Sequence, residues 1–398
     1  MRKGWEYKKL GEVCDVINGL WIGKKEPFIN VAVIRNTNFS KDCQLNLDKV
    51  AFIDVEVKQF ASKKLKFGDI IIEKSGGSEK QPVGRPILFN ISDGNYSFSN
   101  FTSTLRIKDN TEVNSAYLHK CLYAFYLKGE TIKLQSKTTG LHNLNIKGYL
   151  RLNIPLPPLS TQLAIVSELD KINELIRLKK EQLKDFDNLA QSLFYEMFGD
   201  PVENEKGWEV KKLGEICTDI TDGDHMPPPK SESGIPFITI SDIDKDTRCL
   251  NFENTFYVPE DYYNNLKENR KPQKGDLLYT VTGSYGIPVI VKTDKKFCFQ
   301  RHIALLRPNK EILSTIFLCY WVLSDGVKFM ADKVATGIAQ KTVGLNSIRK
   351  FSCILPPLPL QQLFAQRIEQ IEREKSEVQK SIQDLETLLA SRMQYWFE

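Results

Sequence analysis

The chain has 398 residues, of which 41% are hydrophobic and 26% are charged, so it can form ordinary globular cores. No apolar run approaches the roughly 18–20 residues of a membrane span, and the first nine residues lack the apolar stretch of a signal peptide. These features exclude the membrane-spanning and secreted classes, and we expect a cytoplasmic protein with no membrane partner. The eight cysteines include no Cys-x-x-Cys pair, which argues against a zinc site or a disulfide framework.

One phrase opens both halves of the chain. Residues 4–14 read GWEYKKLGEVC, and residues 207–217 read GWEVKKLGEIC. Near the end of each half, the sequence LPPL recurs at 156–159 and 355–358. This spacing indicates a tandem duplication of one domain, because solenoid repeats have periods of only about 20–50 residues. A doubled unit offers two similar surfaces that can diverge separately, which suits a target with two non-identical halves.

Each half contains short β-rich runs followed by a helical segment. We expect strands at 31–34, 70–73, 87–89 and 103–107, then at 236–240, 276–281, 289–291 and 304–307. Helices are expected over 115–127 and 314–323. The pattern predicts an α+β fold with a twisted sheet in each half. The dipeptides Gly68-Asp69 and Gly275-Asp276 are expected to form a structural turn before a buried strand.

The loops after these buried strands differ most between the halves. They are rich in glycine and small polar residues, which let a backbone approach a ligand closely. The candidate ligand-contacting residues here are Lys74, Ser75, Gly76, Gly77, Ser78 and Arg85 in the first half, with Thr282, Ser284 and Tyr285 in the second. Basic groups can reach phosphates or guanine, and hydroxyls can reach bases or backbone. Solvated hairpin loops without a ligand would have the same composition.

A long amphipathic segment follows each LPPL sequence. Apolar residues recur at heptad spacing through 160–198, and the same register returns 199 residues later. Lys179, Lys375 and Arg392 interrupt the apolar seam and can fix its register, although Arg392 can equally snorkel at a frayed end. Each helix would span about 58 Å. We expect the two stripes to bury each other in an antiparallel coiled coil; the alternative is packing on each helix's own domain or on another chain.

These observations predict four segments with a pseudo-two-fold relationship. Residues 1–159 form a first globular domain, 160–199 a first spacer helix, 200–358 a second domain and 359–398 a second spacer helix. The phrase that follows the first helix is found, for the second helix, at the N-terminus of the chain. Joining Glu398 to Met1 would nearly close a symmetric ring, so we expect the two termini to lie close together.

The charge distribution is compatible with a polyanionic partner. The net charge is +5, and each helical segment (160–198 and 359–398) carries five Lys or Arg and seven Asp or Glu, which leaves +9 on the remaining residues. A basic globular surface is typical of proteins that bind a phosphate backbone. Ordinary solubility charge would give a similar balance.

The sequence lacks the motifs of methyltransferases, of P-loop enzymes and of metalloenzymes. None of its Pro-Pro sites fits the Asp/Asn/Ser-Pro-Pro-aromatic motif of adenine and cytosine-N4 methyltransferases, and residues 19–24 are one residue short of a P-loop. The four histidines show no metal-ligand spacing. We therefore predict no catalytic residues, no metal and no cofactor. The rival hypotheses are a methyltransferase or nuclease with fused recognition domains, and a coiled-coil interaction protein without a DNA role.

The combination of motifs resembles the specificity subunit (HsdS) of type I restriction–modification systems. The resemblance covers essentially the whole chain and includes MFGDP at 197–201, DGDHMP at 222–227 and GIPF at 234–237. It implies two tandem target-recognition domains that each read half of a bipartite, asymmetric site in double-stranded DNA. It further implies that the helices form the spacer, that the subunit is non-catalytic, and that two modification (methyltransferase) subunits and the restriction (endonuclease) subunits are its partners.

Further DNA-contacting candidates come from matching the two repeats. Residues 100–102 (Asn-Phe-Thr) align with residues 300–302 (Gln-Arg-His), which are polar but chemically different. We expect Asn100, Thr102, Gln300, Arg301 and His302 to read sequence. Thr139, Gln340 and Lys341 precede the long helices and are expected on the phosphate backbone, and Asp222 and His225 lie in a turn that presents polar groups to a ligand.

Overall fold

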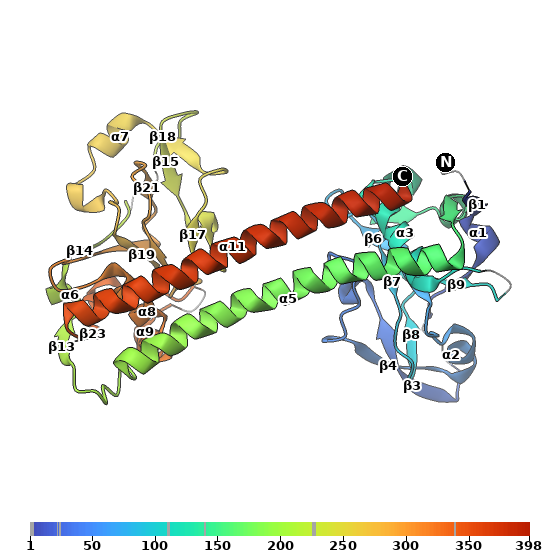
Figure 1. Cartoon of the computed structure of the whole chain (residues 1–398), viewed down its shortest axis with the longest axis horizontal. Coiled ribbons are helices and arrows are strands. Elements are labelled where there is room, and N and C mark those ends of the chain that lie inside the picture. Colours follow the sequence, from blue (N-terminus) through green and yellow to red (C-terminus); the bar gives the residue numbers. More distant parts are fainter. Residues whose placement is uncertain are drawn as a thin grey trace. The chain divides into compact units, whose positions relative to one another are not determined.

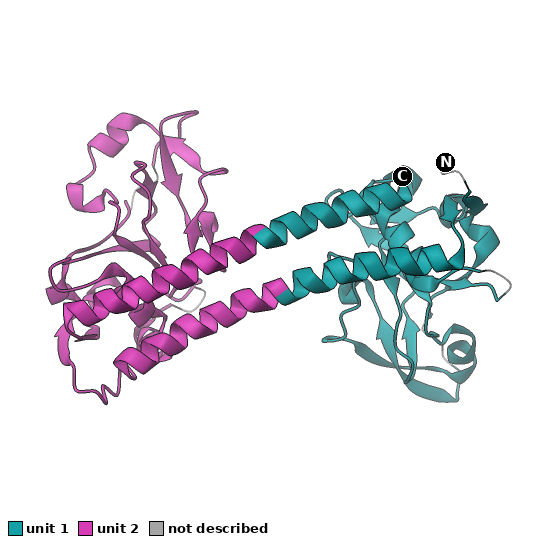
Figure 2. Cartoon of the chain, viewed as in Figure 1, with its two compact units in different colours: residues 1–178, 381–398 teal, residues 179–380 magenta. Residues whose placement is uncertain are grey.

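The computed structural model describes residues 4–21, 23, 25–109, 112–138, 141–224, 228–337 and 340–398. The chain divides into two compact units, residues 1–178 with 381–398 (unit 1) and residues 179–380 (unit 2) (Figure 2). Two 40-residue helices, α5 (Leu159–Phe198) and α11 (Leu358–Phe397), each contribute one half to each unit (Figure 1). The division into recognition domains and spacer helices at residues 159, 199 and 358 stays a prediction.

The main sheet of unit 1 has four antiparallel strands in the order β2-β9-β5-β7. Their bounds are Cys14–Asn18 (β2), Thr102–Ile107 (β9), Ile70–Glu73 (β5) and Pro86–Leu88 (β7). A second sheet has the order β4-β3-β8, formed by Ala51–Glu56, Phe28–Ile34 and Tyr96–Phe98. Helix α3 (Ser115–Leu127) packs beside β7. The four strands and the helix predicted in this half are confirmed, with small shifts in their ends.

Both faces of β5 are buried, which explains its run of isoleucines. Ile70 and Ile72 face a core shared with α3 and the long helices. Ile71 faces the opposite core, together with Ile34 of β3 and Phe98 of β8. A strand covered on both faces needs apolar residues at successive positions rather than in alternation. The main sheet is therefore the middle layer of the unit.

Unit 2 repeats this arrangement strand by strand. Its main sheet has the order β14-β22-β19-β20, formed by Cys217–Asp222, Ile303–Pro308, Leu277–Thr280 and Pro288–Ile290. Its second sheet has the order β18-β15-β21, formed by Phe256–Val258, Ile235–Ile238 and Cys298–Phe299. Helices α8 (Thr315–Leu323) and α9 (Asp325–Val334) follow. The predicted strands and helix of the second half are confirmed, and α9 is an addition.

The duplicated phrase forms the same edge structure in both units. In unit 1 it supplies β1 (Glu6–Lys9), which pairs with β12 (Asn153–Leu156) immediately before α5. In unit 2 it supplies β13 (Glu209–Lys212), which pairs with β23 (Ser352–Leu355) immediately before α11. The phrase therefore holds the segment from which each long helix starts.

The predicted Gly-Asp turns are confirmed, and each also holds a buried ion pair. Gly68 has a φ of +88° and Gly275 a φ of +95°, conformations that only glycine adopts without strain. Asp69 is 2% exposed and accepts two hydrogen bonds from Arg106, at 2.8 and 2.6 Å. In unit 2, Asp276 makes the matching pair with Arg307, at 2.9 and 2.8 Å.

A buried glutamine anchors the first turn of each long helix. The amide of Gln162 accepts a hydrogen bond from the backbone N–H of Asn114 and donates to the carbonyls of Glu112 and Pro157. Gln361 makes the equivalent three bonds to Ser314, Ile312 and Pro356. Both side chains are at most 1% exposed. These bonds fasten α5 to the loop before α3, and α11 to the loop before α8.

Within each unit the two helix segments pack on each other and on the globular core. In unit 2, Asp187 of α5 contacts Lys375 of α11, whereas Phe194 contacts Phe364. The contacting residue numbers increase along α5 while they decrease along α11, so the two helices are antiparallel. In unit 1, Ile165 and Leu169 of α5 share a core with Met393 and Phe397 of α11. The predicted seam is therefore confirmed, and the helix ends additionally bury aromatic residues against the sheets.

Charged residues on the α11 seam meet carboxylates of α5. In unit 1 Arg392 binds Glu168, whose other oxygen accepts from the indole N–H of Trp396 at 3.0 Å. In unit 2 the ammonium of Lys375 lies 2.8 Å from the carboxylate of Asp187. Arg392 is thus a partner in the seam rather than a side chain at a frayed end. Among the described residues, no helix is both long and apolar enough to cross a membrane.

Candidate nucleic-acid interface

Three distant segments of unit 1 meet at the end of β5. The backbone N–H groups of Lys74 and Ser75 donate to the carbonyl of Phe101, at 2.9 and 3.0 Å. The carbonyl of Lys74 accepts from the N–H of Leu144 at 2.8 Å, and the Ser75 hydroxyl bonds to Asn143 at 2.5 Å. The loops predicted to contact DNA around residues 74–78 and 100–102 therefore meet residues 143 and 144 at one place in the fold.

The segment Ser75–Gly77 is a strand within the region that was predicted to be a loop. It forms β6, which pairs with β11 (Leu141–Leu144), and β11 pairs with β10 (Gln135–Thr138). Gly76 has a φ of +100°, and a Cβ there would lie 3.2 Å from the amide nitrogen of Asn36. The glycines thus let the strand pass close to its neighbours, which composition alone could not distinguish from a turn.

Asn36 completes this surface, although no sequence pattern pointed to it. Its side-chain amide donates to the carbonyl of Ser75 at 2.7 Å. It belongs to the 3₁₀ turn Asn36–Asn38, whose counterpart in unit 2 is Ile240–Asp242. The signal was weak because the two turns share a backbone conformation but few residue types. Comparing 3₁₀ turns between repeats would have found it.

Two partly buried lysines give the unit 1 surface a positive charge. Partial burial lowers the pKa of Lys74, and burial together with the charge of Lys74 lowers the pKa of Lys63. Lys63 donates to the carbonyl of Gly19 at 2.7 Å, and Lys74 has no ion-pair partner among the described residues. Such desolvated ammonium groups gain when an anion approaches, as a phosphate would.

Several predicted residues support the surface from beneath it. Arg85 is 5% exposed, and its guanidinium lies 2.6 Å from the buried carboxylate of Glu73. A side chain held in this way cannot reach DNA, so Arg85 is removed from the candidate interface. Thr102 is fully buried and donates to the carbonyl of Ser99, and Gly77 is also buried. Ser78 is exposed in the turn that follows β6.

Unit 2 builds the equivalent surface from the equivalent segments. Val281 donates to the carbonyl of His302 and accepts from the N–H of Val343, both at 2.9 Å. The hydroxyls of Thr282 and Thr342 are 3.2 Å apart, in the place of the Ser75–Asn143 pair. Gly283 donates to the carbonyl of Lys341 at 3.0 Å, which brings the exposed Lys341 and Gln340 to this surface.

The strand register corrects the predicted match between the two reading segments. Thr102 donates to the carbonyl of Ser99, and Ile303 donates to the carbonyl of Gln300, so Ser99 is the equivalent of Gln300. Asn100 consequently matches Arg301 rather than Gln300, and Phe101 matches His302. The prediction was off by one residue because loop lengths differ between the halves, whereas the paired strands set the true offset.

Arg301 is an exposed cation on the unit 2 surface. Its side chain is exposed, and no hydrogen bond or ion pair is recorded for its guanidinium among the described residues. Burial and the neighbouring charge of Arg301 lower the pKa of His302 below its ordinary value of 6.5, so the ring is neutral at pH 7. A neutral imidazole offers one donor and one acceptor.

The acidic residues of the 222–225 turn are compensated by a neighbouring arginine. Arg270 lies 3.5 Å from Asp222 and 3.8 Å from Asp224, and the Tyr262 hydroxyl donates to Asp224 at 3.2 Å. The described residues contain no group of three or more His, Cys, Asp or Glu side chains arranged to hold a metal ion. The predicted residues His225 and Thr139 lie outside the described residues.

The remaining predicted residues of unit 2 are tied to neighbouring elements. The Tyr285 hydroxyl donates to Asp332 of α9 at 2.5 Å, and Ser284 accepts from Lys245 at 3.1 Å. Lys245 belongs to the hairpin of β16 (Ile243–Asp244) and β17 (Cys249–Leu250). These contacts place the loop after β19 against the β16–β17 hairpin and against α9.

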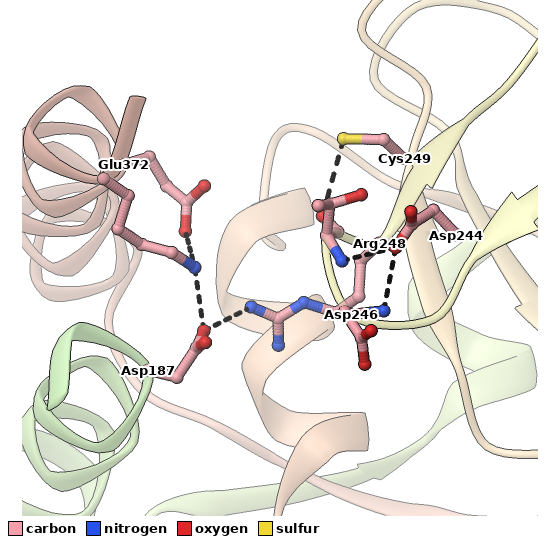
Figure 3. A network of polar contacts seen from close by, with 8 residues as sticks. Asp187, Asp244, Asp246, Arg248, Cys249 and Glu372 are labelled. Carbon is pink, nitrogen blue, oxygen red and sulfur yellow. Dashed lines mark hydrogen bonds and ion pairs between the residues drawn. The ribbon is translucent and has the colours of Figure 1, made fainter. Parts of the chain in front are cut away.

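That hairpin is also bonded to the helix pair of unit 2. Arg248 at its end lies 3.1 Å from the carboxylate of Asp187 on α5, which also binds Lys375 of α11 (Figure 3). Lys375 in turn lies 3.4 Å from Glu372. The equivalent position of Arg248 in unit 1 is Cys43, which is buried and shares its positive φ. The ionic tether between hairpin and helices is therefore specific to unit 2.

Comparisons with known proteins point in one direction. A family model described as the type I restriction modification DNA specificity domain matches the chain twice, over residues 2–185 and 205–387. The type I restriction enzyme EcoKI specificity subunit of Escherichia coli is 25% identical, over 96% of this chain and 84% of that protein. The StySPI specificity subunit of Salmonella potsdam is 24% identical, over 98% and 87%. The putative MjaX specificity subunit of Methanocaldococcus jannaschii is 22% identical, over 97% and 92%.

The fold is shared with a chain of known structure. A chain described under complex assembly and conformational transition of the type I R-M system superposes with a TM-score of 0.64 at 19% identity. The match covers 100% of this chain and 98% of that one. The family model covers most of the sequence and both repeats, so the resemblance seen in the motifs is confirmed. The chain belongs to the type I restriction modification DNA specificity family.

Proposed function

We propose that this chain reads a bipartite, asymmetric site in double-stranded DNA, with unit 1 on one half-site and unit 2 on the other. The observation that carries the proposal is the pair of matched surfaces. Backbone bonds at Lys74 and Val281 are the same in both units, whereas the exposed side chains differ. Asn100 and Phe101 stand where Arg301 and His302 stand in the other unit. A shared scaffold with different side chains is what reading two different sequences requires.

The chain acts with the other subunits of a restriction–modification complex and does not itself catalyse methylation or cleavage. In the proposed complex, two modification subunits use the bound specificity subunit to reach adenines in the site, and restriction subunits join this core. The proposed DNA-contacting set is Lys74, Ser75, Gly76, Ser78 and Asn100 in unit 1, with Thr282, Ser284, Tyr285, Gln300, Arg301, His302, Gln340 and Lys341 in unit 2. Thr139, Asp222 and His225 complete it.

Methylome sequencing of cells that express this chain with its cognate modification subunit tests the proposal. We expect one methylated bipartite motif. Arg301→Ala should relax one position of a single half-site, at a cost of about 1–3 kcal/mol in discrimination, because arginine binds guanine in a bidentate manner. Asn100→Ala is the matched variant and should relax the other half-site only.

Two results would contradict this assignment. Methylation without a fixed motif would remove the reading function altogether. A uniform loss of binding with Arg301→Ala on all DNA sequences, together with a shallower salt dependence, would place Arg301 on a phosphate instead of a base.

A further inference from the structure

A cleft of about 350 Å³ opens in unit 1 beside the reading segment. Its floor is apolar, formed by Leu20, Val33 and Val55, each at most 8% exposed. Two aromatic rings form its walls and remain open to solvent, since Trp21 is 64% exposed and Phe101 is 45% exposed. Large exposed aromatic residues around an apolar hollow are unusual on a protein surface and mark a binding site.

Two oxygen atoms in the wall of this cleft have no hydrogen-bond partner. They are the side-chain carbonyl of Asn36 and the hydroxyl of Ser99, both of which are buried. The orientation of Asn36 is set by its amide nitrogen, which donates to the carbonyl of Ser75 at 2.7 Å. The oxygen of Asn36 is therefore an unsatisfied acceptor beneath the cleft surface, and a bound N–H would satisfy it once the side chain turns toward the cleft.

The cleft is continuous with the candidate nucleic-acid interface. Asn100 and Phe101 line it, and the carbonyl of Phe101 holds Lys74 and Ser75 in place. Unit 2 has no apolar counterpart among the described residues, because the equivalents of Leu20 and Phe101 are Asp224 and His302. The two half-sites thus meet different chemistry, apolar in unit 1 and polar in unit 2.

We infer that this cleft receives the C5-methyl group of a thymine in the half-site read by unit 1. Thymine presents an apolar group in the major groove, and its paired adenine presents an amino group beside it. Trp21 and Phe101 supply apolar walls for the methyl group, while Asn36 and Asn100 supply amide groups for the adenine edge. The inference rests on the proposed function and names the chemistry of its first half-site.

Uracil is thymine without its C5-methyl group, so DNA that contains uracil in place of one thymine tests the inference. The motif is first defined by methylome sequencing, and duplexes are then made with uracil in place of one thymine at a time. We expect one thymine of the unit 1 half-site to matter, with binding by the complex with modification subunits about three- to fivefold weaker on removal of its methyl group. 5-Bromouracil should restore affinity because bromine is apolar and similar in size to a methyl group.

Variants connect that effect to the cleft. Trp21→Ala and Phe101→Ala should weaken binding to thymine DNA and abolish the difference between thymine and uracil. Phe101→Leu retains an apolar side chain and should keep part of the difference. His302→Ala in unit 2 is the matched control, and it should leave the difference unchanged.

The outcomes separate this inference from the proposed function. A specific motif whose unit 1 half-site contains no thymine, or in which uracil costs nothing, would overturn the inference and leave the reading function intact. A rise in the fluorescence of 2-aminopurine in that half-site on binding, if Trp21→Ala and Phe101→Ala abolished it, would mean that a whole base enters the cleft rather than a modification subunit, and would also overturn the inference. The absence of any sequence-specific binding would remove the proposed function itself.

Discussion

At the scale of single residues, the two Gly-Asp turns combine a backbone requirement with a charge requirement. Asp69 closes the turn by accepting from the backbone N–H of Lys66 at 2.8 Å, and it also binds Arg106. The carboxylate is almost fully buried, whereas the guanidinium of Arg106 is one-quarter exposed. One side chain thus joins the turn before β5 to the neighbouring strand β9, and Asp276 does the same in unit 2.

Asp69→Asn should destabilise unit 1 by about 3 kcal/mol, because removing one partner of a buried ion pair leaves the other charge uncompensated. Hydrogen exchange followed by mass spectrometry would show the loss in β5 and β9, with unit 2 unchanged. Asp276→Asn should give the reverse pattern.

Glu6→Gln is the control, because it breaks the exposed pair with Lys8 and should lower the free energy of unfolding by less than about 1 kcal/mol. Equal effects of Asp69→Asn and Glu6→Gln would refute the structural role.

At the scale of elements, the end of α11 is clamped to α5 in unit 1 by one glutamate. Glu168 binds both Arg392 and the indole N–H of Trp396. The hydrogen bond from Arg392 holds the pKa of Glu168 below its ordinary value of 4.5. In unit 2 the equivalent level of the helix pair carries no such pair, because Leu193 stands in the place of Arg392. The clamp therefore distinguishes the two otherwise matched helix ends.

The clamp predicts a specific dependence on pH. A carboxyl group with a lowered folded-state pKa stabilises the fold fully above its unfolded pKa, and this contribution is lost as the pH falls through the folded-state value. Glu168→Gln should therefore speed hydrogen exchange in residues 385–397 at pH 7. The difference from the natural chain should shrink at a second pH well below the ordinary value of 4.5.

A neighbouring glutamate provides the control for this measurement. Glu174 binds Arg177 of the same helix at 2.6 Å and makes no bond to α11. Glu174→Gln should leave exchange in residues 385–397 unchanged at both pH values. If Glu168→Gln left it unchanged as well, the contact between Glu168 and Arg392 would not hold the helix end.

At the scale of the whole molecule, unit 1 contains both ends of the chain. The rings of Trp5 and Trp396 stack with their centroids 6.4 Å apart, and Lys128 donates to the carbonyl of Phe397 at 3.1 Å. The expected closeness of the termini is confirmed for these residues. In unit 2 the continuous chain makes the same joint, where the indole of Trp208 donates to the carbonyl of Phe198 at 2.8 Å.

A circular permutant tests whether the contact between the termini in unit 1 is equivalent to the continuous chain in unit 2. Joining Glu398 to Met1 through a short flexible linker and opening the chain after Val202 should give a protein that folds and supports methylation of the same motif. Val202 is 48% exposed in the segment between α5 and β13, so the new ends fall outside the core. The comparison is a permutant opened after Ile71, which is fully buried and should not fold. If the permutant opened after Val202 did not fold while the natural chain stayed soluble, the two termini would not be joined in the way that residues 198–208 are joined in unit 2.

The sequence predicted several residues that the fold brings together, and the differences between prediction and structure have physical causes. Residues near 74, 100 and 282 were predicted because small and polar residues at strand ends favour close contact with a ligand. Arg85 was misjudged, because a loop arginine that turns inward onto Glu73 has the same sequence context as one that turns outward. Asn36 and the cleft beside Phe101 were missed, because they depend on contacts between distant segments, such as those of Asn36 and Ser75, which are 39 residues apart.

The sequence by itself determined the duplication, the α+β strands, the two heptad helices and the family. These properties are encoded locally, in repeated phrases and in the periodicity of apolar residues. Only the tertiary structure decided which residues of the two halves are equivalent, because strand pairing sets the register while loop lengths drift. It also decided which polar groups form buried pairs and which stay accessible to a ligand, because the partners of the buried groups come from distant strands.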